Sequence, residues 1–296
     1  MRVERAFGSV VVGTTGVCNA SCVHCPTNKP ETAHISRRPM DLSLFESLVD
    51  QLAAGRFAVR CFFSFGLFGD ALLDPLVVQR AEILRAKLPS VPFSINTNAA
   101  AYRPTAHAAL VDYIDALVIH IESLRPEIYD VLMRPLRLEH VLPKIDMILR
   151  DFGRKATVGL PLHRANFGDR TAIAEYFLER GAGEIHFAAL SNRCSQDPCF
   201  DLLALAPQGP PCRGDIVQNL IVDWDGKVLM CCNDFQKKVP VGDLTISSVE
   251  EILENQHRAS FAAKLDAGEW SRIATCSKCK WDKVEPALLG LYRKQI

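Results

Sequence analysis

The sequence lacks the features that mark proteins of membranes, of nucleic acids and of the secretory route. Its 34 Lys and Arg balance 34 Asp and Glu without blocks of like charge, which disfavours a nucleic-acid partner or an anionic membrane surface. It has no apolar run of membrane-spanning length and no signal-peptide pattern at the N-terminus. Internal repeats and low-complexity tracts are also missing. These absences lead us to expect a globular cytoplasmic protein.

Cysteine, in contrast, is plentiful. Eleven cysteines among 296 residues indicate reduced thiols used for metal binding or catalysis, because disulfides rarely persist in the cytosol. A secreted disulfide scaffold would need a shorter chain and an export signal. Since 48% of the residues are hydrophobic, the chain can bury a substantial core, as one large domain or as one domain with a small appendage.

Three of the cysteines form a compact motif near the N-terminus. Cys18, Cys22 and Cys25 follow the spacing C-x3-C-x2-C, with no fourth cysteine nearby in the sequence. Thiolates are the preferred ligands of iron–sulfur clusters, and three of them can ligate three irons of a [4Fe–4S] cube. The fourth iron then remains open to another ligand. A structural zinc site takes four ligands at other spacings, so a zinc or disulfide cluster is the less favoured alternative.

This motif resembles that of the radical S-adenosylmethionine (SAM) superfamily, in which the open iron binds the amino and carboxylate groups of SAM. His24 stands where the family has an aromatic residue before the third cysteine. The resemblance implies that the cluster reduces SAM to methionine and a 5′-deoxyadenosyl radical, which abstracts a hydrogen atom from the substrate. It also implies a flavodoxin or a ferredoxin as the electron donor.

Strand and helix patterns alternate through the first two thirds of the chain. Apolar runs predict six strands, at residues 9–13, 60–64, 92–96, 116–121, 156–160 and 184–189. Helical spacing predicts helices at 41–54, with Asp41 as N-cap, and at 76–88, 107–113, up to 150, and 170–180. The alternation predicts an α/β fold, a parallel sheet with outer helices and a site at the carboxyl ends of the strands. The family resemblance makes residues 1–190 a partial (β/α)6 barrel.

The pattern changes after the sixth predicted strand. Residues 191–211 are rich in Pro, Ser, Asn and Gln and predict a connecting segment. Strands at 220–223 and 228–231 flank Asp225-Gly226, a strong hairpin signal, and helices are expected at 249–255 and 258–265. Residues 212–296 therefore predict a small C-terminal domain.

Four cysteines of this C-terminal part have a spacing of their own: Cys212, Cys231, Cys276 and Cys279. They are a full ligand set for one iron–sulfur cluster or one zinc ion. Their spacing resembles the shortened "twitch" form of the SPASM extension, which carries one auxiliary [4Fe–4S] cluster. The sequence has no cysteine between Cys232 and Cys276 to serve a second one. The resemblance thus implies two [4Fe–4S] clusters, one that binds SAM and one auxiliary.

Polar residues follow the predicted strands where the family holds SAM. Gly69 and Asp70 occupy the place of the family's Gly-Gly-Glu-Pro segment, although Phe68 and Ala71 depart from its pattern. Asp70 is alternatively an ordinary turn cap. Four further polar residues resemble SAM contacts of the family: Asn96, Asn98, His120 and Arg164. Alternatively, these residues serve packing.

Cys232 directly follows Cys231. Adjacent side chains of an extended strand point to opposite sides, so we expect the two thiols not to share a cluster. Cys232 is either a hydrogen-atom donor that faces the substrate or a small buried residue. Of the remaining cysteines, Cys61 is expected in the core, while Cys194 and Cys199 form a local pair or are simple loop residues.

The compact arrangement resembles radical SAM enzymes of aminoglycoside biosynthesis, and the early motif leaves no room for the leader-binding domain of peptide-modifying relatives. We expect a small aminosugar or aminocyclitol substrate near acids, with the candidates Asp70, Glu122, Asp223 and Asp234. One hypothesis is an epimerase with Cys232 as hydrogen donor. The alternative is a dehydrogenase that oxidises a secondary alcohol, with the auxiliary cluster as electron acceptor. A zinc-binding interaction module without catalysis is the third hypothesis.

Overall fold

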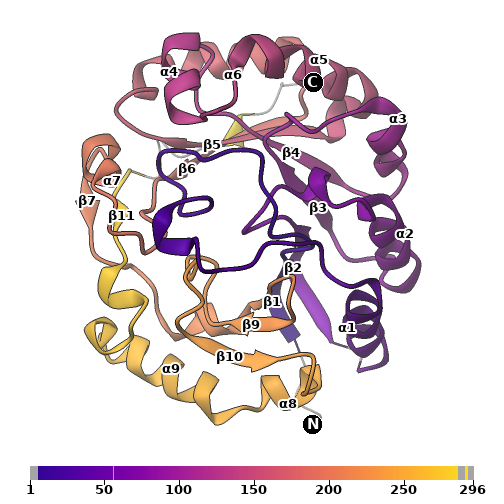
Figure 1. Cartoon of the computed structure of the whole chain (residues 1–296), viewed down its shortest axis with the longest axis vertical. Coiled ribbons are helices and arrows are strands. Elements are labelled where there is room, and N and C mark those ends of the chain that lie inside the picture. Colours follow the sequence, from indigo (N-terminus) through magenta and orange to yellow (C-terminus); the bar gives the residue numbers. More distant parts are fainter. Residues whose placement is uncertain (1–5, 56, 286–290, 293–296) are drawn as a thin grey trace.

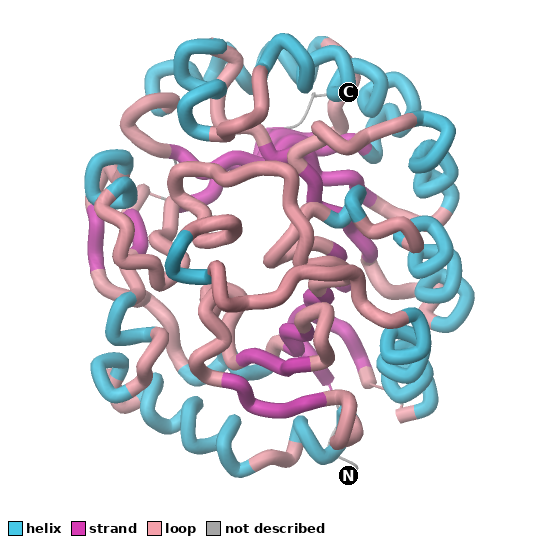
Figure 2. The backbone as a smooth tube through the Cα atoms, viewed as in Figure 1, coloured by secondary structure: helices cyan, strands magenta, loops and turns pink. Residues whose placement is uncertain are grey.

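The computed structural model describes residues 6–55, 57–285 and 291–292. A curved sheet lines its centre, and helices surround the outer face of this sheet (Figures 1 and 2). Six neighbouring strands are parallel to one another. They are β1 (Ala6–Val12), β2 (Ala58–Phe65), β3 (Phe93–Thr97), β4 (Ala116–His120), β5 (Ala156–Leu162) and β6 (Glu184–Ala189). The expected partial (β/α)6 barrel is confirmed.

The helices of the barrel follow the strands in the predicted order. They are α1 (Leu42–Ala54), α2 (Val77–Lys87), α3 (Pro104–His107), α4 (Pro126–Leu132), α5 (Leu138–Phe152) and α6 (Arg170–Glu179). The helix predicted at 107–113 is instead the end of α3 and a 3-10 turn, Ala108–Asp112. Asp41 precedes α1 as expected, but its side chain makes no capping hydrogen bond. Among the helices that the structure describes, none has both the length and the apolar character of a membrane span.

The C-terminal part extends the barrel sheet. Its elements are α7 (Cys199–Leu203), β7 (Pro207–Gln208), β8 (Leu220–Val222), β9 (Lys227–Leu229), β10 (Pro240–Asp243), α8 (Val249–Leu253), α9 (Gln256–Asp266), β11 (Trp281–Asp282) and β12 (Leu291–Tyr292). The ten-stranded sheet has the order β10-β9-β8-β1-β2-β3-β4-β5-β6-β12. The predicted hairpin exists, and β8 continues the sheet in parallel beside β1, a pairing that the sequence did not predict.

Two local expectations are wrong. Cys61 is exposed rather than buried in the core. The second hairpin strand ends at Leu229, so Cys231 and Cys232 lie in the following turn, where the strand argument for opposite orientations does not apply. The connecting segment contains α7 and the short strand β7, which pairs with β11.

The two faces of the barrel strands differ in chemistry. Phe45 of α1 packs edge-on against Phe65 of β2, which in turn contacts Phe93 of β3, with ring centroids 5.5 and 4.7 Å apart. Residues of the opposite face, among them Ser64 and Asn96, line a cavity. Because side chains alternate along a strand, the apolar residues hold the helices while the polar ones line the barrel interior.

A buried ion pair lies beside the loop that follows β2. Arg80 of α2 donates from Nε to Asp74 Oδ2 at 2.8 Å and from Nη2 to the carbonyl of Met40. Both charged side chains are 0% exposed. A buried charge that loses its partner is strongly destabilising.

Replacing Asp74 with Ala should lower the free energy of unfolding by about 3–5 kcal/mol, because the Arg80 charge would stay buried without its partner. Anaerobic urea unfolding measures this change. Asp50→Ala removes the partner of Lys87 in an ion pair that is partly exposed and should cost at most about 1 kcal/mol. Equal effects of the two variants would contradict the prediction.

Candidate active site

A cavity of about 560 Å³ lies at the carboxyl ends of the first strands; we call it the cluster cavity. The loop that follows β1 crosses the front of the barrel in Figure 1 and contributes the three N-terminal cysteines. The cavity brings together most of the predicted site residues: Cys18, Cys22, Cys25, Gly69, Asp70, Asn96, Asn98, His120 and Cys232. Arg164 lies outside it, because its Nε donates to the carbonyl of Ala204 at 2.6 Å.

Gly69 is required where the cysteine loop touches the end of β2. A Cβ atom on Gly69 would lie 2.5 Å from the carbonyl oxygens of both Thr15 and Val17, closer than real Cβ contacts. The neighbouring Asp70 N–H donates to the Val17 carbonyl at 2.9 Å. The glycine therefore lets two backbones approach each other directly, which fixes the start of the cysteine loop.

Asp70 joins the ends of β2 and β3. Its buried carboxylate accepts hydrogen bonds from Thr97 Oγ1 at 2.9 Å and from the N–H groups of Asn98 at 2.7 Å and Leu72 at 3.0 Å. Burial raises the pKa of Asp70 although these donors oppose the shift. The bonds position Asn98, whose Nδ2 donates to Asn19 Oδ1 at 2.8 Å inside the cysteine loop.

The three N-terminal thiols suit a cluster with one iron left open. Burial raises the pKa of Cys18 to about 12 and that of Cys22 well above its usual value, and the positive charge of bound iron would favour their thiolate forms. Within the described residues, no group of three His, Cys, Asp or Glu could chelate a single ion. In a cube each cysteine binds a different iron, and three thiols that share a cavity fit that arrangement.

Each of two cysteine sulfurs accepts a hydrogen bond from the protein. The Ala20 N–H lies 3.5 Å from Cys18 Sγ, and Arg193 Nη1 lies 3.1 Å from Cys25 Sγ. Such outer contacts orient ligands and tune the bound metal. Arg193, which the sequence analysis missed, is a cation that the structure places at this site, where Arg37 also acts electrostatically on Cys18 and Cys25.

Cys232 is the thiol of the C-terminal half that reaches the cluster cavity; the other described cysteines of that half lie outside it. A hydrogen bond with Cys231 and the charge of Arg193 lower the pKa of Cys232 to about 7 against the effect of burial. The Cys232 thiol thus lines the cavity, and its charge also acts on Cys212 and Cys279.

Electrostatic interactions connect three of the predicted auxiliary ligands, Cys212, Cys276 and Cys279, and Cys194 also reaches this group. Burial and the negative charge of Cys279 raise the pKa of Cys212 to about 11 and that of Cys276 to about 12. A hydrogen bond with Cys232, burial and the negative charges of Cys232 and Cys194 raise the pKa of Cys231. A hydrogen bond with Cys279, together with burial, raises the pKa of Cys194. The sequence analysis assigned Cys194 no role, and the structure places it at this site.

Asp234 orients the turn that carries Cys231 and Cys232. Its buried carboxylate accepts from Thr275 Oγ1 at 3.0 Å and from the Val239 N–H at 2.7 Å. Asp223 forms an ion pair with Lys237 at 2.5 Å. Neither of these acids lines either of the two described cavities.

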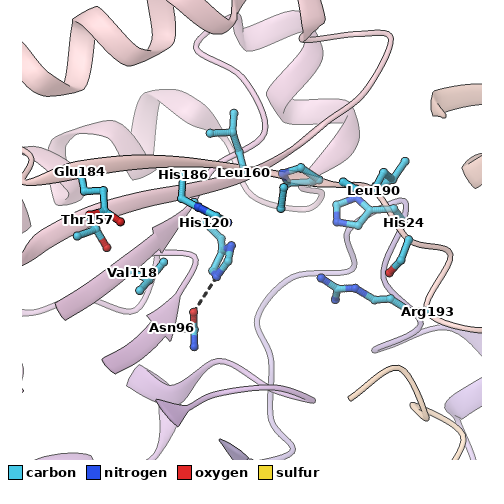
Figure 3. A pocket seen from close by; sticks show the side chains of 15 residues that line it. His24, Asn96, Val118, His120, Thr157, Leu160, Glu184, His186, Leu190 and Arg193 are labelled. Carbon is cyan, nitrogen blue, oxygen red and sulfur yellow. Dashed lines mark hydrogen bonds between the residues drawn. The ribbon is translucent and has the colours of Figure 1, made fainter. Parts of the chain in front are cut away.

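A second cavity of about 340 Å³ opens deeper in the barrel; we call it the barrel cavity (Figure 3). Its lining includes His120, Asn96 and Arg193, which the cluster cavity shares, so the two cavities adjoin. His120 Nε2 and Asn96 Oδ1 lie 3.0 Å apart. Glu184 and Thr157 lie at one end of the view and Arg193 at the other (Figure 3). The lining of the barrel cavity thus combines polar side chains with apolar ones such as Val118, Leu160 and Leu190.

Glu122 lies beside the junction of the cavities between two histidines. Its carboxylate oxygens lie 3.4 Å from His24 Nε2 and 3.0 Å from His163 Nε2. Burial alone would raise the pKa of Glu122, but the two histidines hold it below its usual value. Glu122 therefore interacts directly with two histidines of the protein.

Comparison with known protein families agrees with this geometry. The model of the radical SAM superfamily matches residues 12–177, more than half of the chain, and a SPASM iron–sulfur cluster-binding domain matches residues 212–280. The chain belongs to the radical SAM superfamily and carries a C-terminal SPASM domain. Its cofactors are SAM, the [4Fe–4S] cluster that binds SAM, and auxiliary iron–sulfur chemistry in the SPASM domain. Among curated proteins, none matches the sequence significantly.

Solved structures share the fold. BtrN in complex with AdoMet and 2-DOIA is 19% identical, with a TM-score of 0.64 and 94% coverage of each chain. SuiB of Streptococcus suis bound to the precursor peptide SuiA is 10% identical, with a TM-score of 0.69, over 88% of this chain and 67% of that one. The protein anSMEcpe with bound AdoMet is 13% identical, with a TM-score of 0.65, over 92% and 89%.

Gly69→Ala should prevent full iron loading at the N-terminal cysteines, because the added Cβ would push the Thr15–Val17 backbone away. Iron content and visible absorption after anaerobic reconstitution measure this loss. Gly168→Ala is the matched control, since an added Cβ there meets nothing within 4 Å, and it should keep its iron. Normal iron loading of Gly69→Ala would show that the loop tolerates the displacement.

Proposed function

We propose that this radical SAM enzyme epimerises one carbon of a small aminosugar or aminocyclitol, with Cys232 as the hydrogen-atom donor. The observation that carries the proposal is the position of Cys232 in the cluster cavity together with Cys18, Cys22 and Cys25. We assign these three cysteines to the cluster that binds SAM. Cys212, Cys231, Cys276 and Cys279 are assigned to the auxiliary cluster.

The chain's residues have distinct tasks in this reaction. When held by Cys18, Cys22 and Cys25, the cluster together with SAM would supply the radical chemistry that removes a hydrogen atom from the substrate carbon. Cys232 then gives its S–H hydrogen to the other face of that carbon, so the S–H bond breaks as a new C–H bond forms. The thiyl radical left on Cys232 needs one electron and one proton to return to the thiol. A flavodoxin or ferredoxin is the proposed source of the electrons.

Oxidation of a secondary alcohol is the second candidate. Cys231, a proposed auxiliary ligand, is hydrogen-bonded to Cys232, so the auxiliary site lies directly beside the cavity. A substrate radical there could lose a proton and an electron to form a ketone. The same short distance between the auxiliary site and the cavity would also allow the auxiliary cluster to reduce the Cys232 radical in the epimerase reaction.

The lining of the barrel cavity supports a polar, amine-bearing substrate. Glu184, His186 and Thr157 line it alongside Asn96 and His120. A carboxylate binds an ammonium group by a charge-assisted hydrogen bond, and hydroxyl groups suit the amide and imidazole groups. A volume of about 340 Å³ falls within the range of small-molecule sites. We propose Glu184 as the anchor of the substrate amine.

In deuterated solvent an epimerase should insert one non-exchangeable deuterium into its product, because the Cys232 thiol exchanges with solvent. Cys232→Ala should then abolish the product, while 5′-deoxyadenosine still forms from SAM. Mass spectrometry of the product, with liquid chromatography of the nucleoside, measures both results.

Cys61→Ala, at an exposed position of β2, is the control and should keep full activity. A product without deuterium at the reacting carbon, formed equally well by Cys232→Ala, would reject the epimerase and favour the dehydrogenase.

Glu184→Gln should raise KM at least about tenfold for aminoglycosides, since a charge-assisted hydrogen bond contributes about 1.5–3 kcal/mol. The measurement compares 5′-deoxyadenosine formation with amine-bearing substrates and with analogues that carry hydroxyl in place of amine. Glu179→Gln, on the outer end of α6, should change nothing. An equal effect of Glu184→Gln on both kinds of substrate would argue against recognition of the amine.

A further inference from the structure

The loop after β6 connects the two cysteine sites through consecutive residues. Arg193 donates from Nη1 to Cys25 Sγ at 3.1 Å, at the N-terminal site. The next residue, Cys194, is hydrogen-bonded to Cys279, at the auxiliary site. The Arg193 guanidinium also lies over the ring of Phe235, 5.2 Å from its centroid. The cation is therefore held by contacts on two sides.

The backbone of this loop is fixed from the auxiliary side. Arg193 and Cys194 have φ angles of 49° and 58°, the left-handed region that residues other than glycine avoid. Buried Asn192 holds them there: its Oδ1 accepts from the N–H groups of Cys194 at 3.0 Å and Lys280 at 2.8 Å, and its Nδ2 donates to the Lys278 carbonyl at 2.7 Å. A residue kept in a disfavoured conformation is a candidate for a functional task.

The groups around the guanidinium show what that task is. Arg193 interacts electrostatically with Cys25, Cys22 and Glu122, which all favour its charged form. Its positive charge also acts on His24, His120 and Cys232. Glu122 is already paired with two histidines, whereas the hydrogen bond to Cys25 is direct. The main partner of Arg193 is thus the sulfur of a cysteine assigned to the SAM-binding cluster.

We propose that Arg193 acts through Cys25 as a positioning residue that raises the reduction potential of the SAM-binding cluster. Reduction adds one negative charge to a cluster, and hydrogen bonds to its sulfurs together with nearby positive charge stabilise that state. Because Asn192 fixes the loop to residues 278–280, the auxiliary site determines where this charge lies. The inference holds for an epimerase and for a dehydrogenase alike.

The test is an anaerobic redox titration of the reconstituted holoenzyme without SAM, followed by electron paramagnetic resonance. Addition of SAM afterwards identifies the signal of the SAM-binding cluster, since only that signal should change. Arg193→Gln keeps an N–H donor but removes the charge. We expect its cluster equilibrium to shift about tenfold toward the oxidised state, which is about 59 mV for a one-electron couple. The potential of the auxiliary cluster should stay unchanged.

Arg193→Lys keeps the charge on a different donor, so its potential should lie between those of Arg193→Gln and the unaltered protein. It also provides the measurement if Arg193→Gln does not retain iron. Arg180→Gln removes an exposed charge that lies against Tyr176 on the outer surface and should shift neither cluster. An unchanged SAM-cluster potential in the Arg193 variants that retain iron, or equal shifts of both clusters, would overturn the proposal.

Discussion

The site depends on the contact between the backbone of the cysteine loop and the end of β2. Gly69 admits this contact, and the Asp70 N–H completes it with a hydrogen bond to Val17. The Asp70 side chain then connects the same point to Thr97 and Asn98 at the end of β3. Three successive barrel strands are joined in this way, so the rigid sheet determines the separation of the three thiols.

Two pairs of consecutive residues connect the N-terminal site with the auxiliary site. Cys231 and Cys232 lie in one turn, and Cys232 faces the cluster cavity. Arg193 and Cys194 lie in another loop, where they contact Cys25 and Cys279 respectively. Because each pair spans a single peptide unit, a shift of the auxiliary cysteines would move groups at the other site. The geometry of one site therefore depends on the geometry of the other.

The barrel and most of the cavity-lining residues could be predicted because their signals are local. Apolar runs bounded by turns mark the six strands, and Asn96, Asn98 and His120 follow directly from where those strands end. Arg193 and Cys194 carry no such signal. Their placement depends on a left-handed backbone and on hydrogen bonds from Asn192 to residues 86 and 88 positions away. Arg164 likewise lies outside both cavities, and its partner is a residue 40 positions away, Ala204 at the C-cap of α7.

The place of β1 in the sheet has a consequence for how the molecule is made. One edge of β1 pairs with β2, while the other meets β8, and the Asn219 side chain bonds to Ser9 across 210 residues of sequence. On the ribosome that second edge stays open until most of the chain has emerged, and such distant pairings form slowly. The strand that leads into the cysteine loop therefore gains its second neighbour only after residues 220–222 have been synthesised.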